Sequence, residues 1–465
     1  MFLLLLISCG FIVYKIFRYY RWVQKFPRGP FPLPFVGNYY QLSGDKMCLE
    51  LEKYSKEYGS MFTVFLPVPV VVLADYETVR QAFVVQGEEF SDRPKDALAD
   101  EIFAYCENGG IIAATGDAWR EQRRTALNIL RDFGMGRNVM EEKITISNII
   151  NEMLFGFCYD FDDAEPLMNF LESFKKFMME VNGSPLLLIA MKFPFIKHIP
   201  ILGYHAVWKH KEIVSKIKQY IVDAADKAMD SFDPDGEPEC FVHAYKQRAA
   251  DNEHLTHPQL LSICNDFFVA GQESTSNTLR WAMLFMADNI SVQEKVREEI
   301  FFVVGRDRLP SMADRRQMPF TTATILEVQR KANIVGMNVS HYVSKEVRLK
   351  GMTIPVGALV NGDLHNILAN DPIFEDGNIF QPERFLSDDG KSLNKEMVDR
   401  CVPFSMGRRQ CAGEALARVE LFLGITATLQ RYAILPCPDC PVDLDPVYGS
   451  IITPKKNLLR LVQLD

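Results

Sequence analysis

The sequence predicts a mainly α-helical protein with small β-sheets. Apolar residues recur at helical spacing along most of the chain, whereas residues 61–74 and 340–360 have strand character interrupted by Pro or Gly turns. No Gly/Ser-rich or Pro-rich linker follows residue 45 in this chain of 465 residues. We therefore expect one large globular body after that point.

The N-terminus is expected to be a membrane anchor over residues 1–25. Residues 2–17 are almost wholly apolar, and the apolar run is somewhat short for a spanning helix, so a cleaved signal peptide is the alternative. Retention is favoured because the positive charge follows the apolar run, and the positive-inside rule then keeps the body cytosolic. The basic residues are Lys15, Arg18, Arg21 and Lys25. Residues 26–45 form a stiff Pro-rich hinge.

Helices are predicted in chain order from apolar periodicity and end signals. They cover residues 76–86, 117–131, 146–157, 165–182, 208–230, 257–288, 291–304, 320–333 and about 413–431. Residues 61–74 predict two short strands around a Pro turn, and 340–360 predict further strands. A Pro- and Gly-rich tail of short strands closes the chain.

Composition limits the function. The chain is 48% hydrophobic with 33 Phe and 19 Met, which is enough to fill a large core and to wall an apolar cavity. The net charge of −9 argues against nucleic acid as a main partner. The ten cysteines show no disulfide-framework spacing, so a reducing compartment fits best. The pair Cys437 and Cys440 is interpreted as an ordinary loop, with zinc or redox use as the alternative.

Cys411 is the most informative residue. It lies between a glycine-bearing loop and the start of a helix, where partial positive charge and free N–H groups favour a thiolate. Arg409 adds a full positive charge two residues earlier. Such a thiolate is a candidate nucleophile or metal ligand, and a buried structural cysteine is the alternative.

The surrounding residues decide between these roles. Five positions match the pattern Phe-x-x-Gly-x-Arg-x-Cys-x-Gly: Phe404, Gly407, Arg409, Cys411 and Gly413. This loop resembles the haem-binding loop of the cytochrome P-450 superfamily. The resemblance implies that Cys411 is the axial thiolate ligand of the haem iron, that Arg409 pairs with a propionate, and that Phe404 also contacts the cofactor. Thiolate ligation favours O–O cleavage.

A second element supports the resemblance. Glu327 and Arg330 lie at i,i+3, a spacing that alone is common and worth about 0.2–0.5 kcal/mol. They resemble the superfamily's Glu-x-x-Arg helix, and Arg384 falls in a segment that resembles the loop completing the cluster. The resemblance implies a structural role for these three charges.

A third element is the segment from Val269 to Thr275. It resembles the oxygen-binding helix, and the resemblance implies that Glu273 and Ser274 are catalytic residues that deliver protons. Ser274 departs from the usual Thr and lacks the methyl group that restricts the rotamer. The alternative is a solvated Glu beside ordinary helical hydroxyls.

Further residues follow from the resemblance. Trp119 and Arg123 share one helix face and, like His341, are expected at haem propionates. The neighbouring arginines are expected to face solvent, either as a docking patch for an acidic flavoprotein or as a plain solvated face; they are Arg120, Arg124 and Arg131. Apolar substrate-pocket candidates, for which ordinary core is the alternative, are Ile112, Ala113, Ala270, Gly271, Val335, Val339 and Ile451.

The resemblance covers nearly the whole chain and is closest to family-2-like animal microsomal enzymes, of nematode type. One departure is that a helix starting near residue 140 runs almost at once into residues that resemble the start of the next helix, at 149–156. The expected fold is therefore the cytochrome P-450 fold (α+β) lacking about one helix near residue 145. Its loss would strip apolar cover from the central helices.

The implied function is a haem-thiolate monooxygenase, with residues 46–465 as the catalytic domain. It would use haem b and electrons from NADPH through a flavoprotein reductase, with cytochrome b5 as a further partner. Its substrate would be an apolar lipid, fatty acid or xenobiotic, and its location the cytosolic face of the endoplasmic reticulum membrane. The alternatives are a reductase-independent haem-thiolate isomerase and a non-catalytic or unstable member that retains haem poorly.

Overall fold

The computed structural model describes residues 2–42, 47–66, 68–133, 146–160, 163–182, 185–438 and 440–464. The chain forms two compact units. The first unit contains residues 1–94, 335–375 and 402–410, and the second contains 95–334, 376–401 and 411–465. The boundary between residues 410 and 411 divides the predicted haem loop, so each half belongs to a different unit.

The first unit combines short helices with a small sheet. Its helical elements are α1 (Phe2–Val23), α2 (Met47–Tyr58), α3 (Tyr76–Arg80), the π-helix η1 (Gln81–Val85) and α14 (Leu364–Asn370). Its strands are β1 (Met61–Phe65), β2 (Pro69–Leu73), β3 (His341–Tyr342), β4 (Val347–Leu349), β5 (Met352–Ile354) and β6 (Leu359–Gly362).

The sheet has the strand order β1-β2-β6-β3. Strands β1 and β2 are antiparallel, β2 and β6 are parallel, and β6 and β3 are antiparallel. Every residue of β1 and β2 is buried, which explains why both read as continuous apolar runs. Their side chains pack with Leu42 and Leu51 into the core of this unit.

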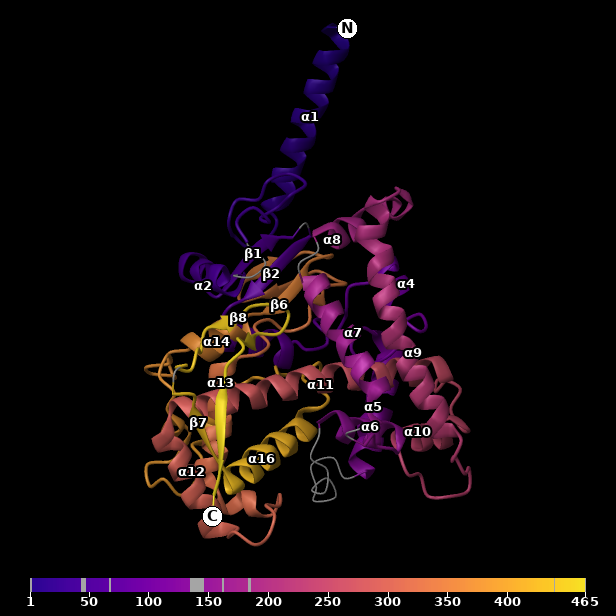
Figure 1. The fold of residues 1–465 in the computed structure, drawn as a ribbon. Helices are drawn as coiled ribbons and strands as arrows, with labels where there is room; N and C mark the ends of the chain where they lie inside the picture. Colours follow the sequence, from indigo (N-terminus) through magenta and orange to yellow (C-terminus); the bar gives the residue numbers. More distant parts are fainter. Residues whose placement is uncertain are drawn as a thin grey trace. The chain divides into compact units, whose positions relative to one another are not determined.

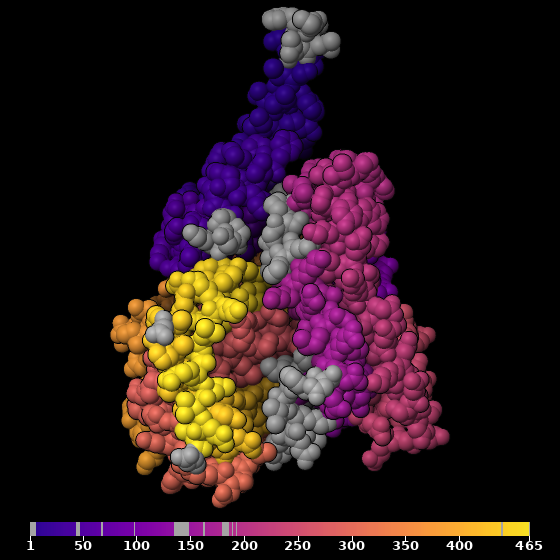
Figure 2. Space-filling model, in the orientation of Figure 1, coloured from indigo at the N-terminus to yellow at the C-terminus, as the bar shows by residue number. Residues whose placement is uncertain are grey.

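Helix α1, within the indigo part of Figure 2, presents apolar side chains to solvent. The exposed side chains include Leu6, Ile7, Phe11, Ile12, Val13 and Phe17. Lys15 and Arg21 each lie over an aromatic ring one turn earlier, that of Phe11 and Phe17 respectively. In the described part of the chain, no helix is long and apolar enough to cross a membrane.

The second unit is mainly helical. Its elements up to residue 288 are α4 (Ala97–Phe103), α5 (Gly116–Asp132), α6 (Ile146–Phe155), α7 (Glu165–Asn182), α8 (Pro185–Lys192), η4 (Pro194–His198), η5 (Tyr204–Trp208), α9 (Lys209–Met229), α10 (Phe241–Ala249) and α11 (His257–Asp288). Then follow α12 (Ile290–Val303), η6 (Asp314–Gln317), α13 (Pro319–Ala332), η7 (Pro382–Phe385), α15 (Lys395–Arg400), α16 (Glu414–Arg431), β7 (Tyr432–Pro436), β8 (Pro446–Val447), β9 (Thr453–Pro454) and β10 (Leu459–Gln463).

Helix α11 links the two main cores of this unit. Its first half packs with α5, α6, α7, α9 and α10, and its second half packs with α12, α13 and α16. Figure 1 shows α11 and α16 lying side by side, and the two helices are in contact. Thr256 begins α11 by accepting a hydrogen bond from the N–H of Gln259, as an N-cap does.

The predicted long helices and strands are confirmed, most to within a few residues at each end. The helix predicted at 76–86 begins as α3 and continues as the π-helix η1. Six helices were not predicted: α2, α4, α8, α10, α14 and α15. The segment near residue 145, where a shortened region is predicted, falls within 134–145 and so lies outside the described residues.

Candidate functional site

Cys411 precedes helix α16 in the second unit. Its side chain is exposed, yet desolvation by the surrounding protein raises the pKa of the thiol. The backbone N–H of Gly413, the positive charge of Arg123 and the N–H of Glu414 act in the opposite direction and favour the thiolate. The residue is therefore exposed, the surrounding protein disfavours the thiolate, and the nearby donors offset part of that cost.

Helix α5 places Arg123 near this sulfur. Burial lowers the pKa of the guanidinium, and the negative charge of Cys411 raises it in part. Trp119 is buried one turn earlier. The neighbouring arginines are exposed as predicted, and two of them form ion pairs within α5: Arg120 with Asp117 at 2.5 Å and Arg124 with Glu121 at 2.6 Å. These pairs favour a charge-balanced solvated face over an uncompensated docking patch.

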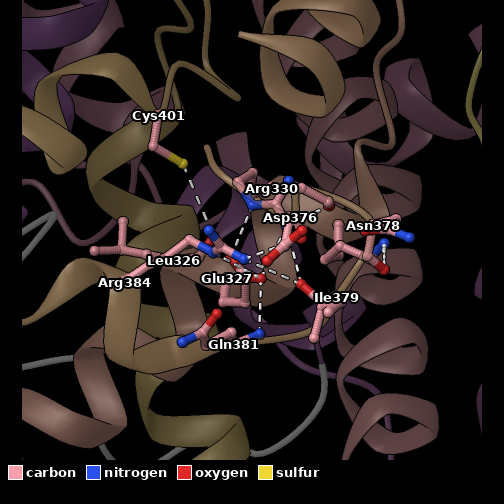
Figure 3. A network of polar contacts seen from close by, with 11 residues as sticks. Leu326, Glu327, Arg330, Asp376, Asn378, Ile379, Gln381, Arg384 and Cys401 are labelled. Atoms are coloured by element: carbon pink, nitrogen blue, oxygen red, sulfur yellow. Dashed lines mark hydrogen bonds and ion pairs between the residues drawn. The ribbon is translucent and has the colours of Figure 1, made fainter. Parts of the chain in front are cut away.

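The predicted Glu327 cluster, made of Glu327, Arg330 and Arg384, is assembled in the second unit (Figure 3). Arg330 donates two hydrogen bonds to the Glu327 carboxylate, from Nε to Oε2 at 2.8 Å and from Nη2 to Oε1 at 2.9 Å. Arg384 Nε reaches Oε1 at 3.3 Å, and the N–H of Gln381 donates to the same oxygen at 2.9 Å. Glu327 is 0% and Arg330 1% exposed, so the network replaces water completely around the carboxylate.

The arginines of the cluster also fasten the following loop. Arg330 Nη2 donates to the carbonyl of Gly377 at 2.8 Å, and Arg384 Nη2 to that of Ile379 at 3.3 Å. The network therefore joins α13, the loop from 376 to 381 and η7. This supports the structural role that the resemblance implied, because both arginines bind the Glu327 carboxylate and backbone carbonyls of the neighbouring loop.

Glu273 and Ser274 lie on α11 and have different partners. The Ser274 hydroxyl donates to the carbonyl of Ala270 at 2.8 Å, and Asn277 Nδ2 donates to Glu273 Oε1 at 2.8 Å. Thr275 is buried and hydrogen-bonds Glu420 of α16, whose pKa burial raises to about 8. The Thr275 side chain therefore packs against α16. Glu273 and Ser274 are less buried, and they remain the candidate pair for proton delivery.

Packing explains the glycine on this helix. A Cβ on Gly271 would lie 2.7 Å from Cδ1 of Ile150 in α6. A larger residue at position 271 would displace the end of the Ile150 side chain, so Gly271 allows close packing where α6 meets α11, in addition to its predicted place in a pocket. Helix α11 stays regular through this position.

The first unit holds the other part of the loop. Arg409 Nε donates to the carbonyl of Ser91 at 2.8 Å. Gly407 has φ +82°, and a Cβ there would lie 1.9 Å from the carbonyl oxygen of Phe83, so only glycine fits. The Phe83 ring stacks on His341 at 4.1 Å between centroids. The π-helix η1 thus supports both the loop and His341.

His341 lies between two arginines. Burial, with the charges of Arg93 and Arg409, lowers the pKa of His341 to about 3, so the imidazole is neutral at physiological pH. Its Nδ1 donates to the carbonyl of Phe90. The remaining nitrogen, Nε2, is then an acceptor, so His341 can donate to a carboxylate only after it takes up a proton.

Arg93 is a residue that sequence reasoning missed. It is 7% exposed, and Nη1 donates to the carbonyls of Val339 and Ser340 at 2.8 and 2.9 Å. Two guanidinium groups beside one neutral imidazole make a setting that favours anions. The partners are separated from Arg93 by about half the chain, so no local pattern could have signalled the contact.

Each unit, taken by itself, contains groups of a kind that bind haem. In the second unit, Cys411 is an exposed cysteine with N–H groups beside its sulfur, and a thiolate ligand to iron benefits from such donors. Arg409 and Arg93 offer positive charge suited to carboxylates. The seven predicted pocket residues all keep accessible surface, which is consistent with lining a space but leaves their role a prediction.

Fold and site together define a class, a mainly helical enzyme with a thiolate ligand for haem. The cytochrome P450 family model matches residues 27–147 and 143–461. The chain belongs to the cytochrome P450 family, and it is therefore a P450 monooxygenase with the α+β P450 fold. The two matched segments overlap at 143–147, beside the predicted shortening.

Similar proteins support the assignment to this family. Cytochrome P450 2H1 of Gallus gallus is 33% identical over 480 residues, covering 97% of this chain and 96% of the relative. Cytochrome P450 2K1 of Oncorhynchus mykiss is 34% identical and covers 94% and 92%. Cytochrome P450 2C3 of Oryctolagus cuniculus is 34% identical and covers 91% and 90%. The predicted similarity to family 2 is confirmed, and the nematode type stays a prediction.

Proposed function

We propose that the chain inserts one oxygen atom of O2 into an apolar organic substrate, with electrons passed from NADPH through a flavoprotein reductase. The other oxygen atom leaves as water, so each turnover uses two electrons and two protons. The observation that supports this most is Cys411, an exposed residue whose thiol pKa is raised by desolvation and lowered in part by Arg123 and by the N–H groups that begin α16.

In this proposal the prosthetic group is haem b, which supplies dioxygen activation when it is bound to Cys411. Arg123 and Trp119 in the second unit, and Arg409 and Arg93 in the first, would supply positive charge and donors for its carboxylates, whereas His341 would donate to one only after it takes up a proton. Glu273 holds and releases protons at its carboxylate, and Ser274 passes them on through its hydroxyl. The Glu327 cluster keeps the surrounding chain in place.

The apolar substrate class is supported by the exposed apolar side chains among the predicted pocket residues, Ile112 and Val339 in particular. Lipids, fatty acids and xenobiotics all share this chemistry. Reductase and cytochrome b5 are the proposed electron donors. We keep the reductase-independent isomerase as the outcome that the experiment below must exclude.

We further propose that the protein lies at the endoplasmic reticulum membrane and faces the cytosol. Support comes from the solvent-facing apolar side chains of α1, with arginines at its end, and from exposed apolar residues of the second unit between α8 and η5. Those residues are Leu186, Ile189, Phe193, Phe195, Ile199, Ile201 and Tyr204. Flotation with liposomes, with and without residues 1–25, tests the contribution of α1: deletion should weaken binding.

The function is tested with purified protein in three measurements. Haem content should be stoichiometric, and the reduced carbon monoxide complex should absorb as a thiolate-ligated haem. Oxidation of apolar compounds should require both NADPH and reductase, and Cys411→Ala should abolish it. Turnover of a lipid hydroperoxide without reductase would instead establish the isomerase, and a haem-poor protein would establish the non-catalytic alternative.

A further inference from the structure

A row of side-chain hydrogen bonds runs along α11 from Glu273. Asn277 lies one turn later and is 1% exposed. Its Nδ2 donates to Glu273 Oε1 at 2.8 Å and to the Glu273 carbonyl at 2.9 Å. Its Oδ1 accepts from Arg280 Nη1 at 3.0 Å. Both ends of this buried amide are therefore occupied, one by an anion and one by a cation.

Arg280 is itself fixed by the C-terminal part of the chain. Its Nη2 donates to the carbonyl of Pro454 in β9 at 3.4 Å. Next to it, Trp281 Nε1 donates to the carbonyl of Ile452 at 3.3 Å, which holds the same segment against α11. The guanidinium can only donate, so the amide oxygen faces it as the acceptor and the amide NH2 faces Glu273. The orientation of Asn277 is thus determined by its neighbours.

A plainer interpretation is that Asn277 only satisfies a helix carbonyl. Ser276 and Thr278 do this on either side, with their hydroxyls donating to the carbonyls of Gln272 and Ser274. Asn277 differs from these two residues, because it also donates a hydrogen bond to the Glu273 carboxylate and accepts one from the Arg280 guanidinium. A hydrogen bond to an ionised group is stronger than a bond to a carbonyl, so the carboxylate contact dominates.

We propose that Asn277 is a positioning residue that holds the Glu273 carboxylate in one orientation, with Arg280 fixing the amide. The inference rests on the proposed role of Glu273 in proton delivery. A carboxyl group held in one rotamer takes up and releases its proton from one direction, whereas an unrestrained carboxyl group samples several orientations. Loss of Asn277 should therefore lower the fraction of NADPH electrons that reach product, with the remainder released as hydrogen peroxide or water.

The test is a double-mutant cycle on the full-length haem-loaded enzyme with Asn277→Ala, Glu273→Gln and the double variant. We expect Asn277→Ala to lower product formed per NADPH by about tenfold, the lower end of the range that a hydrogen bond to a charged group supports. In the Glu273→Gln background the same change should have less than about a twofold effect, because the two residues act as one unit. Asn277→Asp, nearly isosteric but no longer a donor, should repeat the loss if Asn277→Ala fails to fold.

The control is Ser276→Ala, which removes a neighbouring bond to a helix carbonyl and leaves the carboxylate contact intact. The free energy of unfolding of the four proteins in the cycle gives a readout without turnover, and it should be non-additive. If Glu273→Gln leaves the product ratio unchanged, the proposed role of Glu273 fails. Two results would overturn the inference while the role of Glu273 stands, provided that Glu273→Gln itself lowers the product ratio. In the first, both Asn277 variants have no more effect on the product ratio than Ser276→Ala has. In the second, Asn277→Ala lowers the product ratio as much in the Glu273→Gln background as in the parent protein. Additive unfolding energies would also overturn it.

Discussion

The Glu327 cluster and the segment from Glu273 to Asn277 each contain a glutamate whose carboxylate accepts hydrogen bonds from nitrogen donors. The two carboxylates differ in their burial and in the number of hydrogen bonds they accept. Glu327 is fully buried and receives four hydrogen bonds from two arginines and a backbone N–H. Glu273 is half-buried, and its carboxylate is bonded by Asn277. The first carboxylate is enclosed by its partners, whereas the second keeps part of its surface accessible.

This difference separates structural from chemical roles within one unit. A buried network is costly to break because the remaining charges are stranded without water. A carboxylate that transfers protons needs an accessible face and a fixed orientation toward its proton acceptor. Substitutions should therefore act on stability and haem retention at the Glu327 cluster, and on the use of electrons at Glu273.

The largest effect is expected from Glu327→Gln. The change leaves Arg330 and Arg384 buried without a counter-charge, so the free energy of unfolding should fall by about 3–5 kcal/mol. Denaturant unfolding measures it. The matched control is Glu50→Gln, which removes the exposed i,i+3 pair with Lys53 and should cost less than about 1 kcal/mol. Equal losses at the two positions would contradict the account.

A pH effect is expected at Glu420, on the side of α11 that faces α16. Burial raises the pKa of Glu420 to about 8 from the ordinary 4.5, so the native state keeps a proton that the unfolded state releases. Stability should therefore fall as pH rises from 4.5 toward 8, by an amount on the order of a few kcal/mol. Glu420→Gln should flatten this part of the stability curve, and an unchanged slope would disprove the assignment.

The two arginines of the cluster should differ. Arg330 holds the carboxylate with two short bonds, whereas Arg384 contacts it at 3.3 Å. Lysine cannot reproduce the guanidinium fork, so Arg330→Lys should cost about 2–3 kcal/mol and Arg384→Lys about 1 kcal/mol. The comparison is made by denaturant unfolding. A reversed order would show that Arg384 is the main anchor.

The smallest effect is expected from Ser274→Thr, which restores the residue usual in the family. The added methyl restricts the side-chain rotamer, so product per NADPH should rise by about twofold while the free energy of unfolding changes by less than about 0.5 kcal/mol. Product and hydrogen peroxide are measured together. A fall in the ratio would show that the smaller hydroxyl suits this helix better.

Much of the fold was predictable because long helices repeat their apolar pattern many times, and α11 was placed at its observed bounds. Helices α4, α14 and α15 were missed because they are too short to show a period. Glu327 and Arg330 were found because a local spacing accompanied the resemblance. Arg93 was missed because its partners are distant in sequence, and Asn277 because an amide one turn after a glutamate is common on any helix.

The central claim is tested most directly by comparing the same substitution, Glu→Gln, at positions 327 and 273. Haem content, free energy of unfolding and product per NADPH are measured on both variants beside the parent protein. The account predicts that Glu327→Gln loses stability and haem, whereas Glu273→Gln keeps both and loses about tenfold or more in product per NADPH. Loss of haem and stability in Glu273→Gln, or their retention in Glu327→Gln, would contradict it.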